Sequence, residues 1–488
     1  MNLLLCFIGV FIGTLIGVLP GLGPAASISL LLPITFSLNP VQAIIMLAGI
    51  YYGAYYGGST TSILINIPGE AASVVTCLDG YQMARKGRAG PALGISAIGS
   101  FIGATVALIM MIFFASLLSK LALKFGPAEF VSLSLLGLTM VTYLSSGSMV
   151  KALMMAAVGL LLGFIGTDVI TGRERYTLGL TPLISGLDII PMVMGLFGIS
   201  EVLLNLEAVH FTRDVFQGEI KGFLPTRQDW KDSAGAMARG SILGSVLGVI
   251  PGGGAVLSSF ASYALEKRIA RHPEKFGTGD IRGVAGPETA NNAGAQGAFI
   301  PLMTLGIPCN VVMAVLFGAL MIHGITPGPG LMEENPKLFW GVIGSMYIGN
   351  AMLLILNLPL IGIWIKILKV PYVFLSPLIF LFCLIGAYTV GNNVQDVYVM
   401  IIFGIVGYLM KKYEYEPAPL VLAFVLGGIL EGAFRQALII SNGDPMIFLS
   451  RPISASFLVV SIFLLVSPLI LGLLGRKRVG LLIDKEDS

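Results

Sequence analysis

Long apolar runs, separated by short polar segments, dominate the pattern of this chain. A helix that crosses a bilayer needs about 20 mostly apolar residues. Runs of that kind recur along the whole sequence, around residues 3–19, 93–118, 128–145, 151–166, 189–206, 238–250, 340–365, 371–390, 396–410, 417–430 and 453–474. Shorter, interrupted apolar runs lie between them. The pattern predicts an all-α polytopic membrane protein of about twelve spanning elements, some of them broken or re-entrant helices.

The composition agrees with a bilayer as the surroundings of the chain. Hydrophobic residues make up 56% of the 488 residues and charged residues only 11%, against roughly 25% charged residues in soluble domains. The net charge of +3 is small, and the basic residues lie in short loops, as topology signals do. The four cysteines and three histidines have no metal-ligand spacing. We therefore expect a lipid bilayer but no nucleic acid as a partner, no cofactor, and no metal beyond a Na⁺ ion.

A glycine-patterned segment occurs twice in the chain. GVFIGTLIGVLPGLG begins at Gly9 and GSILGSVLGVIPGGG begins at Gly240, and both carry a glycine at every fourth position. This spacing places the glycines along one helix face, where another backbone can approach closely. Each stripe then runs into Pro20 or Pro251 and further glycines. Proline removes a backbone donor and glycine tolerates positive φ, so both helices are predicted to break there.

A second pair of segments follows in the same order. YYGAYYGGSTTSILINIPG begins at Tyr51 and NNAGAQGAFIPLMTLGIPC begins at Asn291, and they align on their Ile-Pro steps. A third echo is GSFIG from Gly99 and GSMYIG from Gly344. The duplication predicts two membrane repeats, residues 1–230 and 231–488, within one integral membrane domain.

Loop charges indicate that the two repeats face opposite ways. In the first repeat the basic residues follow the second motif, at 85–88, while the connection before that motif is uncharged. In the second repeat the basic residues lie before the second motif instead, within 267–282. Loops rich in Lys and Arg stay in the cytoplasm, so equivalent loops lie on opposite sides of the membrane. We predict inverted-topology repeats, as in many secondary transporters.

The two breaks and the polar segments after them are candidate binding elements. Freed N–H groups at the N-terminus of a half-helix suit a carboxylate, and freed carbonyls suit Na⁺. Hydroxyls and amides can bind an anion or complete a cation shell without adding a full charge. The alternatives are kinks that serve packing and ordinary interhelical hydrogen bonds. The candidate substrate- and ion-binding residues are Pro20, Gly21, Gly23, Ser59, Thr60, Thr61, Asn66, Pro251, Gly252, Gly254, Asn291, Asn292, Gln296 and Thr304.

Single ionisable residues are weaker signals. Glu288 opens the polar stretch of the second repeat, where it serves either as a proton or sodium site or as a helix cap. Other acidic residues beside apolar runs are interpreted as interface anchors or ion pairs, namely Asp168, Asp188, Glu201, Glu431 with Arg435, and Asp444.

An enzyme and a channel are the competing classes. The string from Gly277 to Asp280 resembles the GxGD motif of intramembrane aspartyl proteases, but Asp280 lies in a basic loop and not in an apolar span with a partner aspartate. The sequence has no Walker motif for ATP hydrolysis. A channel would favour pore-lining rings from an oligomer, whereas this chain holds a duplicated pair within itself. A secondary transporter without catalytic residues is the favoured interpretation.

Five longer motifs indicate a family: LPGLGPAASISLLLPITF, YYGAYYGGSTTSILINIPGE, LDGYQMARKGRAGPALG, PETANNAGAQGAFIPLMTLGIP and EGAFRQALIISNGDP. Together they resemble the large membrane (permease) subunit of the bacterial tripartite tricarboxylate transporters. The resemblance covers nearly the whole chain, although Cys309 stands where the family has glycine.

The resemblance implies a multi-pass permease of the bacterial cytoplasmic (inner) membrane. It implies work with a small membrane subunit and a periplasmic solute-binding protein. It also implies symport of a small carboxylate, such as the tricarboxylate citrate or a related di- or monocarboxylate, on a Na⁺ or H⁺ gradient and not on ATP. A homodimer is compatible with the sequence, which leaves open the carboxylate and the coupling ion.

Overall fold

The computed structural model describes residues 1–19, 23–145, 148–168, 170–207, 222–367 and 372–473. In these residues the regular secondary structure is helical apart from one short antiparallel pairing of β1 (Gly166–Thr167) with β2 (Glu174–Arg175). Five helical stretches are long and apolar enough to cross a membrane: Ala89–Ala122, Ile189–Glu207, Pro336–Asn357, Val394–Lys412 and Pro417–Ile440. Shorter apolar helices accompany them. The prediction of an all-α polytopic membrane protein is confirmed.

The first half of the chain contains ten α-helices among its described residues. They are α1 (Asn2–Gly17), α2 (Gly23–Leu31), α3 (Pro40–Ile65), α4 (Val74–Thr76), α5 (Gln82–Arg85), α6 (Ala89–Ala122), α7 (Pro127–Tyr143), α8 (Met149–Gly163), α9 (Ile189–Val193) and α10 (Ser200–Glu207). Tighter or wider turns connect some of them, namely η1 (Leu32–Ser37), η2 (Ala71–Ser73), η3 (Cys77–Tyr81), η4 (Thr181–Leu183) and η5 (Met194–Ile199).

The second half continues with α11 (Arg227–Gly248), α12 (Gly254–Ile269), η6 (Pro273–Lys275), α13 (Arg282–Gly297), α14 (Phe299–Leu305), α15 (Val311–Ile322), α16 (Leu331–Glu334) and α17 (Pro336–Asn357). It ends with α18 (Ile361–Ile367), α19 (Tyr372–Gly391), α20 (Val394–Lys412), α21 (Pro417–Ile440), α22 (Ile447–Ser450) and α23 (Pro452–Leu473).

Each glycine stripe lies against the backbone of one neighbouring helix. A Cβ added to Gly9, Gly13 or Gly17 of α1 would come within 2.2 to 2.5 Å of a carbonyl oxygen of α3. A Cβ on Gly240, Gly244 or Gly248 of α11 would come equally close, 2.3 to 2.6 Å, to a carbonyl oxygen of α13. The facing carbonyls belong to Met46, Ile50 and Ala54 in the first half and to Gly286, Ala290 and Gly294 in the second. Glycine is required at these positions because no side chain fits between the paired backbones.

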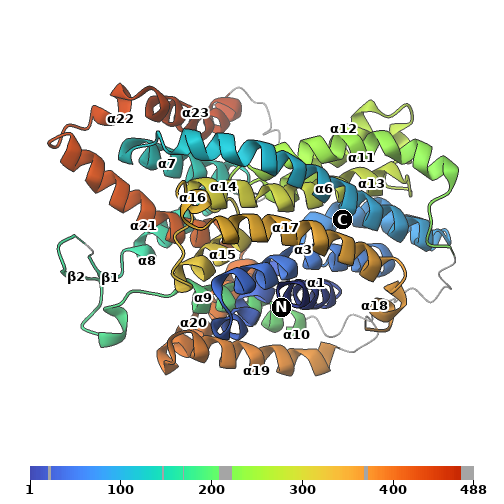
Figure 1. Ribbon diagram of the computed structural model, residues 1–488, viewed down its shortest axis with the longest axis horizontal. Coiled ribbons are helices and arrows are strands. Elements are labelled where there is room, and N and C mark those ends of the chain that lie inside the picture. Colours follow the sequence, from blue (N-terminus) through green and yellow to red (C-terminus); the bar gives the residue numbers. More distant parts are fainter. Residues whose placement is uncertain (20–22, 146–147, 169, 208–221, 368–371, 474–488) are drawn as a thin grey trace.

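The two halves interlock through one long helix from each. Helix α6 of the first half packs along α13 of the second half. Helix α17 of the second half packs against α3 of the first half. Figure 1 shows α6, α11 and α13 side by side, with α1, α3 and α17 grouped near the centre. Helices α7, α8, α21 and α23 form one end of the molecule, and α10, α19 and α20 lie along another side. The first polar segment lies on α3 and the second on α13, and both helices take part in the contacts between the halves.

Candidate functional site

Both glycine helices end in a backbone break. Helix α1 ends at Gly17 and α2 begins at Gly23, while α11 ends at Gly248 and α12 begins at Gly254. Gly23, Gly252 and Gly254 have φ values of +53°, +80° and +47°, a conformation that glycine adopts without strain. Pro251 is partly buried in the second break, and Pro20 and Gly21 lie outside the described residues.

A tight turn lies beside the break in each half. Helix α3 is followed by Asn66 with φ +56°, and α14 is followed by Gly306 with φ +70°, each directly before an Ile-Pro step. The N–H of Gly252 donates to the carbonyl of Cys309 at 2.7 Å, which joins break and turn in the second half. In the first half a Cβ on Gly69 would lie 2.6 Å from the carbonyl oxygen of Gly17. Break and turn therefore meet in both halves.

The structure accommodates the cysteine that departs from the family pattern. Cys309 corresponds to Gly69 in the alignment of the two Ile-Pro steps. Its thiol donates to the carbonyl of Gly248 at 3.5 Å. Gly248 ends its helix as Gly17 ends α1, so the sulfur lies where the first half leaves space for no side chain. Cys309 is fully buried and has a packing role here.

Helices α3 and α13 bring the two polar segments into contact. The hydroxyl of Ser59 donates to Oε2 of Glu288 at 2.5 Å, and the hydroxyl of Thr76 in α4 donates to Oε1. One turn further along α13, the amide of Asn292 donates to Oγ of Ser100 in α6 at 2.7 Å and to Oδ1 of Asn291 at 2.6 Å. These side chains are 3% exposed or less. They form a polar cluster at the contact between the halves.

The cluster extends toward α17. The amide of Gln296 donates to Oδ1 of Asn350 at 3.5 Å, and both residues are almost fully buried. A cavity of about 10 Å³ lies beside Tyr56, Thr60, Ser96 and Asn357. That volume holds about one water molecule. Of the candidate binding residues predicted from the sequence, Thr60 lines this cavity.

Several enclosed polar atoms of this region have no hydrogen-bond partner among the described residues. They are Oη of Tyr56, both carboxylate oxygens of Glu70, Nδ2 of Asn291, Oδ1 of Asn292, Oε1 of Gln296, Nδ2 of Asn350 and Oδ1 of Asn357. More than about 90% of buried polar groups in native proteins are paired, and an unpaired one costs about 1–3 kcal/mol. Such a concentration of free donors and acceptors in an apolar fold fits a site that receives water, an ion or a polar solute.

Three predicted residues point elsewhere. The hydroxyl of Thr61 donates to the carbonyl of Gly58 at 2.7 Å, and that of Thr304 donates to the carbonyl of Ile300 at 2.7 Å. Asn66 is exposed at the end of α3. Bonds from Thr to a preceding carbonyl of the same helix are the usual arrangement in helices. In this conformation the three residues shape the backbone and do not join the polar cluster.

Sequence reasoning misses Glu70, which follows the Pro68-Gly69 step as Asn310 follows Pro308-Cys309. Its carboxylate lies against α3 at Gly58, where an added Cβ would come within 1.6 Å of Oε2. An acidic residue in a Pro-Gly turn between apolar runs is the signal that could have identified it.

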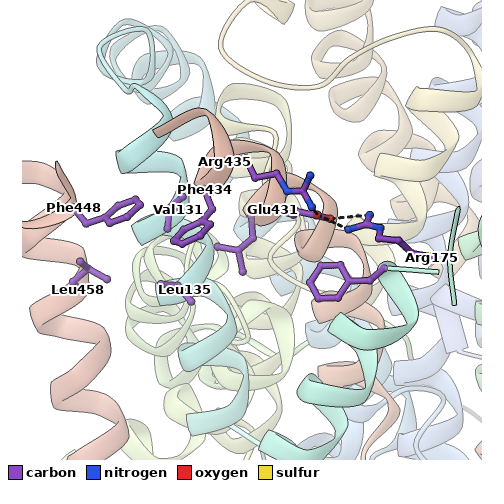
Figure 2. Close-up of a pocket in the computed structure, with 10 residues that line it drawn as sticks. Val131, Leu135, Arg175, Glu431, Phe434, Arg435, Phe448 and Leu458 are labelled. Carbon is purple, nitrogen blue, oxygen red and sulfur yellow. Dashed lines mark hydrogen bonds and ion pairs between the residues drawn. The ribbon is translucent and has the colours of Figure 1, made fainter. Parts of the chain in front are cut away.

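A larger cavity of about 540 Å³ lies among α7, α21, α22 and α23 and is shown in Figure 2. Its lining is apolar apart from Arg175, Glu431 and Arg435. Each arginine contacts Glu431 at 2.6 Å, and Arg435 also contacts Asp168 at 2.9 Å. Both arginines are therefore already paired, and this cavity is a poor site for a carboxylate.

Asp168 belongs to this ion-pair network and lies in the loop after α8. Its carboxylate accepts the backbone N–H of Thr171 at 3.0 Å, that of Ile170 at 2.9 Å, and a hydrogen bond from Arg435 at 3.1 Å. The Thr171 N–H first, and then the Ile170 N–H and Arg435, lower the pKa of Asp168 to about 2 despite the desolvation that opposes them.

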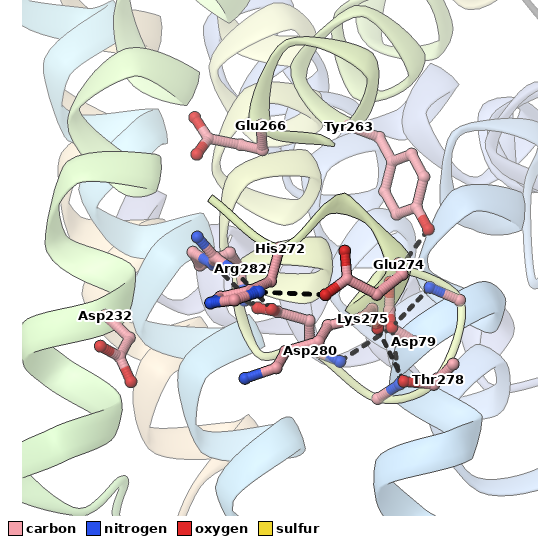
Figure 3. Close-up of polar contacts among 12 residues, drawn as sticks. Asp79, Asp232, Tyr263, Glu266, His272, Glu274, Lys275, Thr278, Asp280 and Arg282 are labelled. Atoms are coloured by element: carbon pink, nitrogen blue, oxygen red, sulfur yellow. Dashed lines mark hydrogen bonds and ion pairs between the residues drawn. The ribbon is translucent and has the colours of Figure 1, made fainter. Parts of the chain in front are cut away.

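The GxGD string has a structural role. Oδ1 of Asp79, from the first half, accepts the backbone N–H groups of Gly277 (2.9 Å), Gly279 (2.7 Å) and Asp280 (2.8 Å). The hydroxyl of Tyr263 donates to Oδ2 at 3.0 Å, and Figure 3 shows the loop closing around this carboxylate. Asp280 itself pairs with Arg282 at 2.6 Å. The string thus anchors the basic loop and does not form a catalytic pair.

Comparison with known proteins identifies the family of the chain. The model of the tripartite tricarboxylate transporter TctA family matches residues 3–422. A protein of Agrobacterium vitis, named as an uncharacterized 52.8 kDa protein in the TAR-I ttuC' 3' region, is 52% identical over 477 residues, which are 98% of this chain and 95% of that protein. Another protein of that organism, named as an uncharacterized protein in the TAR-II ttuC' 3' region, is 57% identical over 215 residues, 44% of this chain and 89% of that protein. No solved structure matches the chain.

The family agrees with the fold and with the buried polar cluster. Its description is that of a transporter and not of an enzyme, and a tripartite system implies further subunits beside this one. The multi-pass helical fold is that of a membrane component. The chain therefore belongs to the TctA family of tripartite tricarboxylate transporters, as a membrane permease subunit.

Proposed function

We propose that this permease takes up a small carboxylate across the bacterial cytoplasmic membrane on a Na⁺ or H⁺ gradient. A periplasmic solute-binding protein delivers the carboxylate, and a small membrane subunit completes the complex. The observation that carries the proposal is the buried polar cluster on α3, α4, α6, α13 and α17, in which α3 and α13 come after the two helix breaks in the sequence. Polar groups inside a membrane protein mark solute and ion pathways.

The cluster provides suitable groups for an anion without a basic side chain. The N-termini of α2 and α12 follow the two breaks, and N–H groups at helix N-termini carry partial positive charge. The amide nitrogens of Asn291 and Asn350 are buried donors without partners among the described residues. Helix ends and amides together are therefore proposed to bind the carboxylate groups.

The cluster also provides acceptors for a cation. The amide oxygens of Asn292, Gln296 and Asn357 are enclosed and have no partner among the described residues. Oxygen ligands of this kind suit Na⁺. An anion and a cation bound near one another reduce the electrostatic cost of burial for both, which favours symport over transport of the carboxylate alone.

We further propose that residues 1–230 and 231–488 are inverted repeats. The matching contacts of the two glycine stripes and the matching left-handed residues Asn66 and Gly306 support this division. Since α6 and α17 each pack against the opposite half, the repeats are proposed to move about the central cluster and expose it to each side in turn.

The test reconstitutes the full chain with its small membrane subunit and binding protein in liposomes. Uptake of labelled mono-, di- and tricarboxylates is measured under separately imposed Na⁺ and pH gradients, with no ATP present. Uptake of at least one carboxylate that follows one of the gradients supports the proposal. A requirement for ATP, or no uptake across the whole panel, contradicts it.

A further inference from the structure

We propose that Glu70 and Glu288 together form the coupling-ion site, which holds one monovalent cation, H⁺ or Na⁺, between the two halves of the protein. This inference rests on the proposed transport function. It adds the residues that bind the coupling ion and the number of ions bound, which is one. Glu70 belongs to the first half and Glu288 to the second.

The same two segments hold both carboxylates. Gly58 and Ser59 are neighbours on α3. Oε2 of Glu70 lies against Gly58, within 1.6 Å of where its Cβ would be, and Oε2 of Glu288 accepts the hydroxyl of Ser59 at 2.5 Å. The segment that starts at Glu70 runs through η2 into α4, whose Thr76 binds the other oxygen of Glu288. Segments far apart in the sequence thus place the two acids against adjacent residues of α3.

No positive charge compensates the pair within the described part of the chain. Neither glutamate takes part in an ion pair there, whereas Glu129, Glu201, Glu266 and Glu431 each pair with an Arg or Lys. Two like charges in a buried site strongly disfavour the state in which both are ionised. A bound cation or a shared proton removes that conflict.

Further oxygen and amide groups converge on the pair. Tyr56, three residues before Ser59 on α3, is 3% exposed, and its hydroxyl has no hydrogen-bond partner among the described residues. Asn291, three residues after Glu288, is fully buried with an unpartnered amide nitrogen. Both carboxylate oxygens of Glu70 are enclosed beside Ser73 of the same segment, and no donor from another described segment bonds to them. These unused groups indicate a ligand and not a completed structural network.

The two halves carry different side chains at the same helix start, since Glu70 is the N-cap residue of η2 and Asn310 that of α15. Asn310 stands at its counterpart position after the second Ile-Pro step. The Asn310 side chain accepts the N–H of Met313 at 2.9 Å and donates to Tyr51 at 3.5 Å, as a helix cap does. Ala48 stands at the counterpart of Glu288. Each acid therefore occurs once in the duplicated framework, which gives one ion site for two repeats.

A cation at this position would couple ion binding to the arrangement of the halves. With the site empty and both groups ionised, the carboxylates repel each other across the contact between α3 and α13. With one cation bound, both carboxylates attract that cation, and the two halves are held together. The free energy of ion binding then depends on conformation, which is the requirement for coupling an ion to a transported solute.

The test measures ion binding without substrate or partners, on the purified full-length chain in detergent. Thermal unfolding midpoints are recorded against NaCl at constant ionic strength with choline chloride, and separately against pH without Na⁺. If Na⁺ is the ion, the wild-type midpoint rises with Na⁺. If a proton is the ion, the midpoint rises as the pH falls and does not depend on Na⁺.

Glu70→Gln and Glu288→Gln are expected to weaken the response by about tenfold or more in ion concentration, and Glu333→Gln, an exposed residue, serves as the matched control. Glu70→Gln keeps a side-chain oxygen that can accept from the neighbouring Ser73, so it tests the site even if Glu288→Gln folds poorly. A wild type that responds to neither ion, or a Glu70→Gln variant with the full wild-type response, overturns the inference.

Uptake in the reconstituted complex separates this inference from the proposed function. Gradient-driven uptake that is unchanged by both glutamine variants contradicts the ion site and leaves the transport function intact. Ion binding that depends on both glutamates, in a complex that takes up no carboxylate, supports the ion site and contradicts the proposed transport function.

Discussion

Ser59 of α3 donates a 2.5 Å hydrogen bond to Glu288 of α13, across 229 residues of sequence. The same hydroxyl also lies 3.0 Å from the carbonyl of Tyr55 on its own helix. A serine hydroxyl that only bonds within its own helix makes the contact to Tyr55 and not the contact to Glu288. The bond to Glu288 therefore joins the polar segment of one half to the acid that opens the polar segment of the other.

Ser59→Ala is expected to weaken ion binding and uptake. Hydrogen bonds to charged groups contribute about 1.5–3 kcal/mol, so the concentration of coupling ion for half-maximal uptake should rise by about tenfold or more. The measurement is initial uptake against ion concentration. Ser62→Ala is the matched control, because Ser62 is equally buried on the same helix and donates to the carbonyl of Gly58. Unchanged ion dependence in Ser59→Ala would assign this serine to packing.

Asn292→Ala is expected to raise the KM for the coupling ion while most of the protein remains folded. The amide of Asn292 links Ser100 and Asn291, and its own Oδ1 has no partner in the described residues. Loss of one buried polar contact of this kind costs about 1–3 kcal/mol, which corresponds to about 5- to 160-fold in KM. Asn205→Ala in α10 is the control, since Asn205 bonds to Glu201 one turn away. A lowered unfolding midpoint with an unchanged KM would argue for packing.

The duplicated features of the fold were predictable because they are periodic. A glycine at every fourth position predicts a close helix contact, and a following Pro-Gly predicts a break, whatever the rest of the chain does. Both expectations match the described geometry at Gly13 and Gly252.

Which residues of the polar runs belong to the site was less predictable from the sequence. Thr61 and Ser59 lie two residues apart in one polar run, but Thr61 bonds to its own helix and Ser59 reaches Glu288. Which side chain faces the other half depends on how α3 and α13 pack, and a polar run alone does not specify that. Glu70 is enclosed because Gly58 has no side chain, a tertiary relationship between two residues of different segments.

Gly13→Ala is expected to destabilise the protein, and Gly344→Ala is its control. A Cβ at Gly13 would lie 2.5 Å from the carbonyl oxygen of Ile50, whereas a Cβ at Gly344 would have no neighbour within 4 Å. Overpacking of this kind costs about 1–3 kcal/mol, so the unfolding midpoint in detergent should fall for Gly13→Ala. Gly344→Ala should leave it equal or raise it slightly, because alanine reduces the entropy of the unfolded chain. Equal midpoints for the two variants would contradict the close packing of α1 and α3.

The ion-pair network around Asp168 is expected to persist in moderately acidic solution. The pKa of Asp168 is lowered to about 2 in the folded protein, against about 3.9 in an unfolded chain. A group with a lowered folded pKa stabilises the protein above its unfolded value, and this stabilisation is lost as the pH falls toward 2. The difference in unfolding midpoint between wild type and Asp168→Asn should therefore be constant from pH 8 to about pH 5 and shrink below about pH 4. A difference that disappears already near pH 6 would show that Asp168 is not held in this way.

Asp79→Ala is expected to release the basic loop from the first half of the protein. The substitution leaves the backbone N–H groups of Gly277, Gly279 and Asp280 without their acceptor, at a cost of about 1–3 kcal/mol for each group that water does not reach. The exposed Arg271 and Lys275 lie in this loop, so limited digestion with trypsin should cut the variant about tenfold faster or more when cleavage follows the population of the open loop. Tyr263→Phe removes a single hydrogen bond to Asp79 and should have a smaller effect. If Asp79→Ala is cut no faster than the wild type, the loop is held by other contacts, and the anchor between the two halves at this position is not needed to keep it closed.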